Sequence, residues 1–519
     1  MESPLFCNIL SCIDFEQYHV ESLAMRMGCD NSELYQKGQT ITVRILQYGF
    51  LVLAFFQIVI GLSRSLFPYD LDQSTVGFMV SNLLLEGKNP WDLNVVLNEP
   101  YCITNYGVFY NIFFAIGQMI LGEQYFFMRF ISFISCFGIC FIVYHLANGR
   151  NHRTEIMNLN QNQWKLNQTG GLIALVLILS SPAFIMNNSI GRSDNFGMAV
   201  SMAGVFLLIR YDKKDSSVWM PLISGLLMGA GPLIKQSLIS SIVFGFYLSW
   251  KKNCFKTVVF TSIGLPALIC SVLTVISKGD FIKICIVYPS LPPKSMMHSW
   301  IIFKSTLLFS PVHFLILGGT ILLVIRIALN WISKKDISLS RSSIFIPWVL
   351  LSGGLALFTS TRELGGSSLY WLEFIIISSA FLGECLSVII ERISDTQKKQ
   401  ILISVVSVLM IGSGLVFSMR SLRGVMFEWS AIPYYRELQS IVSDKTPPDE
   451  PIIEYFSNIG ILTQRKVLFN DLLMYQNTTV ENRELLNSVI ASKKASCLLL
   501  LPQFSANYIS SDYVEVPTK

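Results

Sequence analysis

The sequence is poor in charged residues and in patterned cysteines. Only 14% of its 519 residues are Asp, Glu, Lys or Arg, whereas about 25% is usual for a soluble protein. Its 11 cysteines are scattered and form no C-x-x-C pair, which argues against a zinc ribbon and against a disulfide framework. The net charge is only +5, and no block of Lys and Arg resembles a nucleic-acid patch. These absences exclude an ordinary soluble enzyme and a disordered protein, and nucleic acid is not an expected partner.

Apolar residues are abundant instead, at 52% of the sequence. A membrane-spanning helix needs about 20 mostly apolar residues, because the hydrocarbon core of a bilayer is roughly 30 Å thick. We expect the first such helix over 42–63, and the mixed, polar residues before it do not form a cleavable signal. Ten further runs lie at 125–146, 170–188, 195–210, 218–233, 236–250, 254–276, 301–328, 344–360, 369–390 and 400–418. The sequence therefore predicts a multi-pass integral membrane protein with about eleven spans, surrounded by membrane lipids.

The positions of Lys and Arg predict the orientation of these spans. If the N-terminus is cytoplasmic and the apolar stretch 106–121 does not cross, the basic loops alternate cleanly with loops that hold only isolated cations. Counting 106–121 as a span would invert every later loop. We therefore expect 106–121 to form a helix along the outer surface. The basic inner loops contain Arg150, Arg153, Lys165, Lys213, Lys214, Lys251, Lys252, Lys256, Lys334, Lys335, Arg341, Lys398 and Lys399.

The chain divides into three predicted parts. A cytoplasmic tail occupies 1–41, a transmembrane module 42–419, and an extracytoplasmic domain 420–519. In the last part the short apolar runs PIIEYF, KVLFN and ASCLLLL are separated by turn-rich segments, a pattern typical of strands. We expect an all-α polytopic bundle that carries a small C-terminal α/β domain.

In the outer loop 64–124, the stretch from Ser65 to Gly122 is rich in acidic residues and has a single cation, Lys88. The stretch 74–85 has helical periodicity, so Asp70 and Asp72 lie at a helix start, where a negative charge is favoured. An ionised Asp at the end of a span can act as a general base towards a hydroxyl group. The alternative is a pair of N-capping aspartates on a solvated loop. The acids of the stretch 65–122 are Asp70, Asp72, Glu86, Asp92 and Glu99.

The segment NNSIGRSDNFG lies at the outer end of the third predicted span. Arg192 and Asp194 stand there beside a helix start, with Asn187, Asn188 and Asn195 around them. Because Arg binds phosphate oxygens bidentately, the segment could bind a phosphate or polar sugar hydroxyls. The alternative is a capped helix start with an Arg at the membrane interface.

Three further ionisable residues are predicted on the outer side. Lys235 in GPLIKQS is the only charge between 216 and 250, and Arg362 lies in TSTRELGGSSLYW. Each could bind a lipid phosphate or merely extend to the headgroups. His298 belongs to the proline-containing outer loop 277–300, which could form a flap over the outer surface or only a connector; a lone His is more often structural.

Taken together, these motifs resemble the GT-C glycosyltransferases that use lipid-phosphate sugar donors, with protein O-mannosyltransferases and the lipid A aminoarabinose transferase as relatives. Asp72 followed by LLLEGKNPW looks like the family's Asp, helix and L-x-x-G-x-(N)-P-(Y/W). Asn105-Tyr106-Gly107 stands where relatives often have Tyr/His-Pro-Pro, and this chain lacks those prolines. GRSDNFG looks like the family's Arg-x-x-Asp or Arg-x-Asp, and Lys235 matches a basic residue that often follows the fifth span.

The resemblance implies sugar transfer from a polyprenyl-phosphate donor to an acceptor hydroxyl on the extracytoplasmic face, with inversion. It implies Asp72 as the general base, with Asp70 sharing that role or holding a divalent metal, since some relatives depend on a metal. The acceptor stays open between protein, lipid and glycan, and the membrane between a bacterial plasma membrane and a eukaryotic endoplasmic reticulum. The donor-binding residues implied are Arg192, Asp194, Lys235, Arg362, Tyr106 and His298.

Two other classes stay in competition with a transferase. A transporter or a flippase for lipid-linked sugars would place ionisable residues near the bilayer midplane and often shows paired repeats. Here the distinctive charges lie at the outer ends, charge within the spans is scarce, and no repeat is visible. A scaffold whose outer loops bind a partner is the third class.

Overall fold

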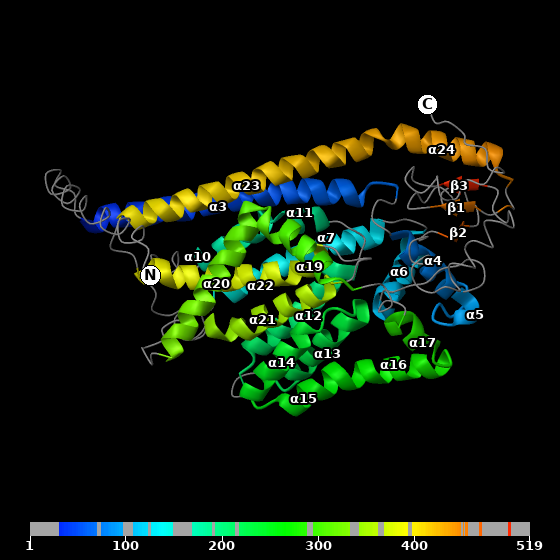
Figure 1. Cartoon of the computed structure of the whole chain (residues 1–519), viewed down its shortest axis with the longest axis horizontal. Coiled ribbons are helices and arrows are strands. Elements are labelled where there is room, and N and C mark those ends of the chain that lie inside the picture. The colour runs from blue at the N-terminus through cyan, green and yellow to red at the C-terminus, as the bar shows by residue number, and fades with distance from the viewer. Residues whose placement is uncertain are drawn as a thin grey trace.

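The chain forms a largely helical bundle in a computed structural model (Figure 1). All structural statements below concern the residues that the structure describes. These are residues 31–69, 74–96, 107–122, 126–148, 169–188, 193–212, 217–287, 294–332, 342–361, 368–392, 397–447, 450, 452–454, 467–469 and 497–499.

Six stretches of helix in this part of the chain are long and apolar enough to cross a membrane. They fall on predicted spans, and the protein is a multi-pass integral membrane protein; the total of eleven stays a prediction. The helices that contain them are α3 (Asn31–Ser65), α7 (Phe126–Ala147), α15 (Phe255–Val259) joined by η1 (Phe260–Gly264) to α16 (Leu265–Ile276), α20 (Pro311–Ile332), α22 (Leu372–Arg392, with η5, Ser368–Trp371, before it) and α23 (Gln397–Ser430).

Shorter helices fill the remaining apolar runs. One expectation is wrong at its beginning: the run 301–328 is not one helix, because α20 begins only at Pro311. Ser310 accepts a hydrogen bond from the amide of His313 (3.4 Å), and proline is favoured in the first turn, so a new helix begins there. The shorter helices are α10 (Thr169–Leu179), α11 (Pro182–Asn187), α12 (Ser193–Arg210), α13 (Trp219–Ile234), α14 (Ser240–Lys251), α19 (Met296–Phe303) with η3 (Lys304–Leu308), and η4 (Ser342–Phe345) with α21 (Ile346–Thr359).

The core of the bundle lies around α10 and α22. Every residue of α10 is buried. A Cβ atom added to Gly383 of α22 would lie 2.4 Å from the carbonyl oxygen of Gly170. Only glycine permits this approach, and small residues are the usual means of close helix packing in membranes.

The outer-loop elements gather at one end of the bundle, far from the start of α3 (Figure 1). α4 (Ser74–Leu85) has the predicted bounds, and α6 (Val108–Leu121) is a helix where a surface helix is expected. α5 (Leu93–Val96) lies between them in sequence. α16 continues into α17 (Asp280–Ile282) and η2 (Lys283–Val287), which reach the same end.

The C-terminal part begins with a long helix. α23 runs through residue 420, the predicted domain boundary, and is followed by α24 (Ile432–Lys445). Likewise, the predicted tail boundary at 41–42 falls inside α3. Three strands, each within one of the three runs predicted as strands, form a parallel sheet of order β2-β1-β3. They are β1 (Ile452–Glu454), β2 (Val467–Phe469) and β3 (Cys497–Leu499).

Candidate functional site

Tight antiparallel packing of α12 on α13 brings two candidate site residues to one place. A Cβ added to Gly204 of α12 would lie 2.6 Å from the carbonyl oxygen of Ser224, and one on Gly231 of α13 would lie 1.8 Å from Ser201 Oγ. Side chains larger than hydrogen would therefore separate the two helices. As a result, the beginning of α12 and the end of α13 lie side by side.

Asp194 and Lys235 form an ion pair at that junction. Their side chains are 8% and 16% exposed, so the pair is shielded from water on most sides. Asp194 lies in the first turn of α12 and Lys235 caps the end of α13, the positions at which helix dipoles favour a negative and a positive charge. The Lys235 ammonium also lies 5.3 Å from the centre of the Tyr370 ring, a cation–π contact. This cluster is therefore electrostatically ordered before any ligand arrives.

The first outer loop contacts the same junction through Gly107. The Gly107 amide donates a hydrogen bond to the carbonyl oxygen of Ile234 (3.1 Å), the residue before Lys235. A Cβ on Gly107 would lie 2.1 Å from the Leu233 carbonyl oxygen, so glycine is required here. Tyr106 lies outside the described residues, yet it directly precedes this contact in the sequence.

His298 lies in the first turn of α19, close to the end of α21. Its amide donates to the N-cap Ser295 (3.3 Å), and the Ser295 amide donates to the carbonyl oxygen of Thr361 (2.7 Å). The Nε2 atom of His298 is buried without a hydrogen-bond partner in the described part of the chain. No ion pair or hydrogen bond among the described residues links His298 to Lys235. Arg362 follows Thr361 in sequence and lies outside the described residues.

The predicted acids Asp70 and Asp72, together with Arg192, also lie outside the described residues. The chain just before Asp70 is described, and the Arg129 guanidinium holds it. Arg129 is 2% exposed and donates to the carbonyl oxygens of Phe67 (2.6 Å) and Tyr69 (2.7 Å). The sequence analysis missed Arg129, although it is the only Lys, Arg, Asp or Glu in the predicted span 125–146. Its position inside an apolar span is the signal that could have identified it, because ionisable residues are rare there.

An Arg129→Met variant is expected to be less stable than the wild type. Two buried carbonyl oxygens would lose their donors, and each loss costs about 1–3 kcal/mol. The midpoint of thermal unfolding of the detergent-purified protein should fall by several degrees. Arg44→Met, which changes an exposed arginine on α3, is the matched control and should leave the midpoint unchanged. Equal midpoints for both variants would show that the guanidinium contacts contribute nothing.

The asparagines of the NNSIGRSDN segment serve mainly to join helices. Asn188 Nδ2 donates to the backbone carbonyl and the Oε1 of Gln57 (2.7 and 2.9 Å), which ties α3 to the end of α11. Asn195 Nδ2 donates to Ser132 Oγ (3.2 Å) on α7. Asn187 Nδ2 donates to the Ala183 carbonyl oxygen (2.6 Å). These amides therefore support the alternative interpretation of the segment as structure rather than as a sugar-binding surface.

Known proteins share this architecture. A family model described as dolichyl-phosphate-mannose-protein mannosyltransferase matches residues 162–276. The fold is similar to that of ArnT from Cupriavidus metallidurans in the apo state, with a TM-score of 0.53, 12% identity, and 85% of this chain and 90% of that chain covered. ArnT bound to undecaprenyl phosphate gives the same TM-score and coverage at 11% identity.

A third solved structure also has a similar fold. The Archaeoglobus fulgidus oligosaccharyltransferase in complex with Zn and sulfate has a TM-score of 0.52 and 14% identity, with 82% of this chain covered but only 62% of that chain. No curated protein matches the sequence. The structural likenesses show the fold, and the family match covers residues 162–276 of the chain.

The described residues contain no group of three or more His, Cys, Asp or Glu side chains that could hold a metal ion. Asp70, the acid that was expected to hold a divalent metal if one binds, lies outside the described residues.

A buried carboxylate lies next to the Lys235 junction and was missed by the sequence analysis. Glu373, in the first turn of α22, accepts hydrogen bonds from Ser240, Ser241 (3.2 Å) and Trp348 Nε1 (3.4 Å). Ser240 begins α14, soon after Lys235. Donors from two neighbouring helices, α14 and α21, therefore satisfy this buried carboxyl group.

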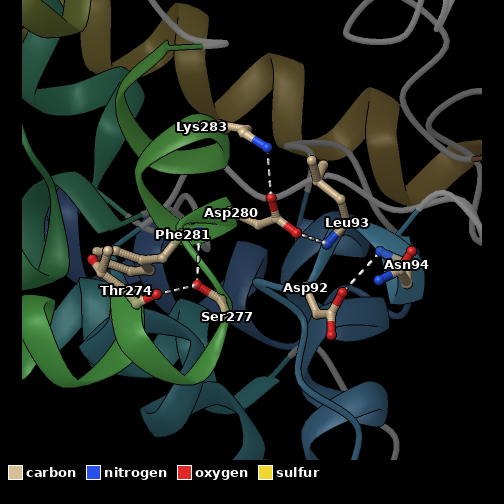
Figure 2. A network of polar contacts seen from close by, with 8 residues as sticks. All are labelled: Asp92, Leu93, Asn94, Thr274, Ser277, Asp280, Phe281 and Lys283. Carbon is tan, nitrogen blue, oxygen red and sulfur yellow. Dashed lines mark hydrogen bonds and ion pairs between the residues drawn. The ribbon is translucent and has the colours of Figure 1, made fainter.

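The predicted outer loop 277–300 docks on the first outer loop through Asp280 (Figure 2). Asp280 Oδ2 accepts from the amide of Leu93 (3.2 Å) at the start of α5, while Oδ1 pairs with Lys283 (2.9 Å). The Phe281 ring meets Trp91 edge-on at 6.2 Å. The loop 277–300 thus contacts the acidic first outer loop at Asp280 and Phe281.

An Asp280→Ala variant is expected to loosen α5. The amide of Leu93 would lose its acceptor, and a four-residue helix has few other bonds to hold it. Hydrogen exchange at residues 91–96 should therefore become faster. Lys283→Met is the matched control, because it removes the ion pair and leaves the Leu93 bond in place. Unchanged exchange in Asp280→Ala would mean that α5 does not depend on the loop 277–300.

Proposed function

We propose that the protein transfers a sugar from a polyprenyl-phosphate donor to an acceptor hydroxyl on the extracytoplasmic side of the membrane. The observation that carries this proposal is the Asp194–Lys235–Tyr370 cluster, which lies beside the first outer loop in a GT-C fold. A shielded ammonium group beside an aromatic ring is suited to a phosphate that carries a sugar. ArnT, which has the same fold, has been crystallised with undecaprenyl phosphate.

The proposed reaction uses one carboxylate as a base and several cations for the phosphate. The acceptor oxygen attacks the anomeric carbon while the carboxylate of Asp72 takes the hydroxyl proton. The bond between the anomeric carbon and the phosphate oxygen breaks on the opposite face, so the configuration inverts. The leaving polyprenyl phosphate takes the electron pair, and Lys235, with Arg192 and Arg362, stabilises its charge. Preorganised cations of this kind contribute several kcal/mol to a transition state.

The other proposed roles are auxiliary. Asp70 shares the base role or holds a divalent metal, and no step above depends on that metal. Tyr106 and His298 contact the donor sugar or phosphate from the outer loops. Asp194 orients the Lys235 ammonium.

The proposed topology has eleven spans, a cytoplasmic N-terminus and an extracytoplasmic end. Residues 1–41 form the tail, 42–419 the catalytic module, and 420–519 a small α/β domain that helps to bind the acceptor. The parallel strands β1 to β3 support an α/β domain. The membrane is the plasma membrane in a bacterium and the endoplasmic reticulum in a eukaryote.

A donor screen tests the proposal. The purified protein is incubated with a panel of polyprenyl-phosphate sugars, and released polyprenyl phosphate is followed with and without a membrane extract as the source of acceptor. Release that needs the extract supports the transferase and names the donor. No release with any donor, together with substrate-dependent flux in liposomes, would contradict it in favour of a transporter or flippase.

A further inference from the structure

An aromatic cluster holds the segment before Asp70 and Asp72 against the C-terminal helices α23 and α24. The Phe67 and Tyr69 side chains are both buried. The Tyr69 ring stacks on Tyr435 of α24 with the ring centres 4.4 Å apart and the planes 20° from parallel. The Tyr69 hydroxyl donates to Gln439 Oε1 (3.0 Å), one turn further along α24. Phe67 packs edge-on against Trp429, near the end of α23, at 5.8 Å.

The helices on both sides of this cluster are joined as well. α3 and α23 run side by side along the bundle (Figure 1). Where α3 ends, Arg64 pairs with Glu428 (3.5 Å), and Trp429 Nε1 donates to the Ser63 carbonyl oxygen (3.2 Å). The segment Leu66–Tyr69 is therefore held between Arg129 of the bundle and the C-terminal helices. Neither contact alone fixes both its backbone and its rings.

We propose that Tyr435 and Gln439 are positioning residues for glycosyl transfer, which they serve by fixing the backbone that leads into Asp70 and Asp72. The inference rests on the proposed function. Asp70 is the next residue after Tyr69, and a chain spans at most about 3.6 Å per residue. Asp72 can therefore lie no further than about 11 Å from Tyr69 along the chain, so a shift of the Tyr69 anchor moves the base. A misplacement of about 1 Å can cost 100-fold in rate.

Tyr69 keeps its hydrogen bond over the range in which such an enzyme is assayed. Burial raises the pKa of the Tyr69 phenol above its ordinary value of 10.0, and the nearby Arg436 lowers it by less. The phenol therefore stays protonated and able to donate at neutral pH. A pH dependence of transfer between about pH 5 and 9 would arise elsewhere.

The first test separates turnover from binding in the full-length protein. Tyr435→Leu should lower kcat about 10-fold and leave the donor KM within about twofold, because the base is displaced while the donor phosphate site is intact. Tyr435→Phe keeps the stacked ring and should restore wild-type turnover. Gln439→Leu, which removes only the hydrogen bond, should give a smaller fall. Glu437→Leu is the matched control, because Glu437 is exposed on the same helix.

The second test needs no activity. Hydrogen exchange measured on peptides covering 66–73 should be faster in Tyr435→Leu than in the wild type, and unchanged in Glu437→Leu. Unchanged exchange in Tyr435→Leu, or an unchanged kcat, would overturn the inference. A raised donor KM at an unchanged kcat would also overturn it. Faster exchange in a protein whose wild type transfers no sugar would support the contact while the proposed function fails.

Discussion

An Asp72→Asn variant is expected to lose sugar transfer by about 10²- to 10⁴-fold in kcat. The amide has nearly the volume of the carboxylate but cannot accept the acceptor's proton, so the step loses its general base and little else. The donor KM should change little, since the phosphate is bound by cations rather than by this carboxylate. The measurement is the rate of polyprenyl phosphate release with the donor that the screen identifies.

Two matched variants make the result specific to Asp72. Asp70→Asn should retain more activity if Asp72 is the base and Asp70 a neighbour. Asp92→Asn alters another acid of the same loop, whose carboxylate accepts a hydrogen bond from the Asn94 amide (2.9 Å) and has no proposed catalytic part. Full activity in Asp72→Asn would refute the assignment of Asp72 as the base, and the description of the fold would be unaffected.

A Lys235→Met variant is expected to lose both stability and activity. Removing one member of a buried ion pair leaves the other charge uncompensated, at a cost of about 3–5 kcal/mol. Asp194, with a side chain only 8% exposed, would be that charge. Loss of activity in this single variant would therefore not distinguish a damaged fold from a lost phosphate contact.

The double variant Lys235→Met/Asp194→Leu resolves the two causes. Replacing both partners by apolar residues of similar size removes the uncompensated charge, so the unfolding temperature should return towards the wild type. Transfer should stay about 10²- to 10³-fold below the wild type, because the donor phosphate has lost a preorganised cation. If the double variant regained both stability and transfer, the ion pair would be purely structural.

Local features of the fold could be predicted from local sequence. The helix 74–85 has the predicted bounds because its apolar residues recur at the helical period within the segment itself. The three strands fall in the predicted runs because each is a short apolar run between turn-rich segments. The run 301–328 was misjudged because its hydropathy is continuous, whereas the Ser310–Pro311 pair starts a new helix within it.

Features that depend on partners could not be predicted. Arg129 and Glu373 look out of place in apolar spans until their partners are known. The asparagines near Asp194 looked like a polar surface. Asn188 and Asn195 donate to other helices in the interior, and Asn187 donates within its own helix. The stacking of Tyr69 on Tyr435 joins the segment after α3 to α24, far along the chain, and no pattern along the chain indicates it.

The sequence by itself determined that this protein lies in the membrane, which runs can cross it, and which charged residues are candidates for chemistry. It could do so because the length and period of an apolar run are fixed by neighbours along the chain. Only the tertiary structure decided which side chains contact one another. Asp194 pairs with Lys235, and Arg129 and Tyr435 contact the segment before Asp70. These contacts depend on how closely whole helices pack, and that closeness depends on single glycines and aromatic rings far apart in sequence.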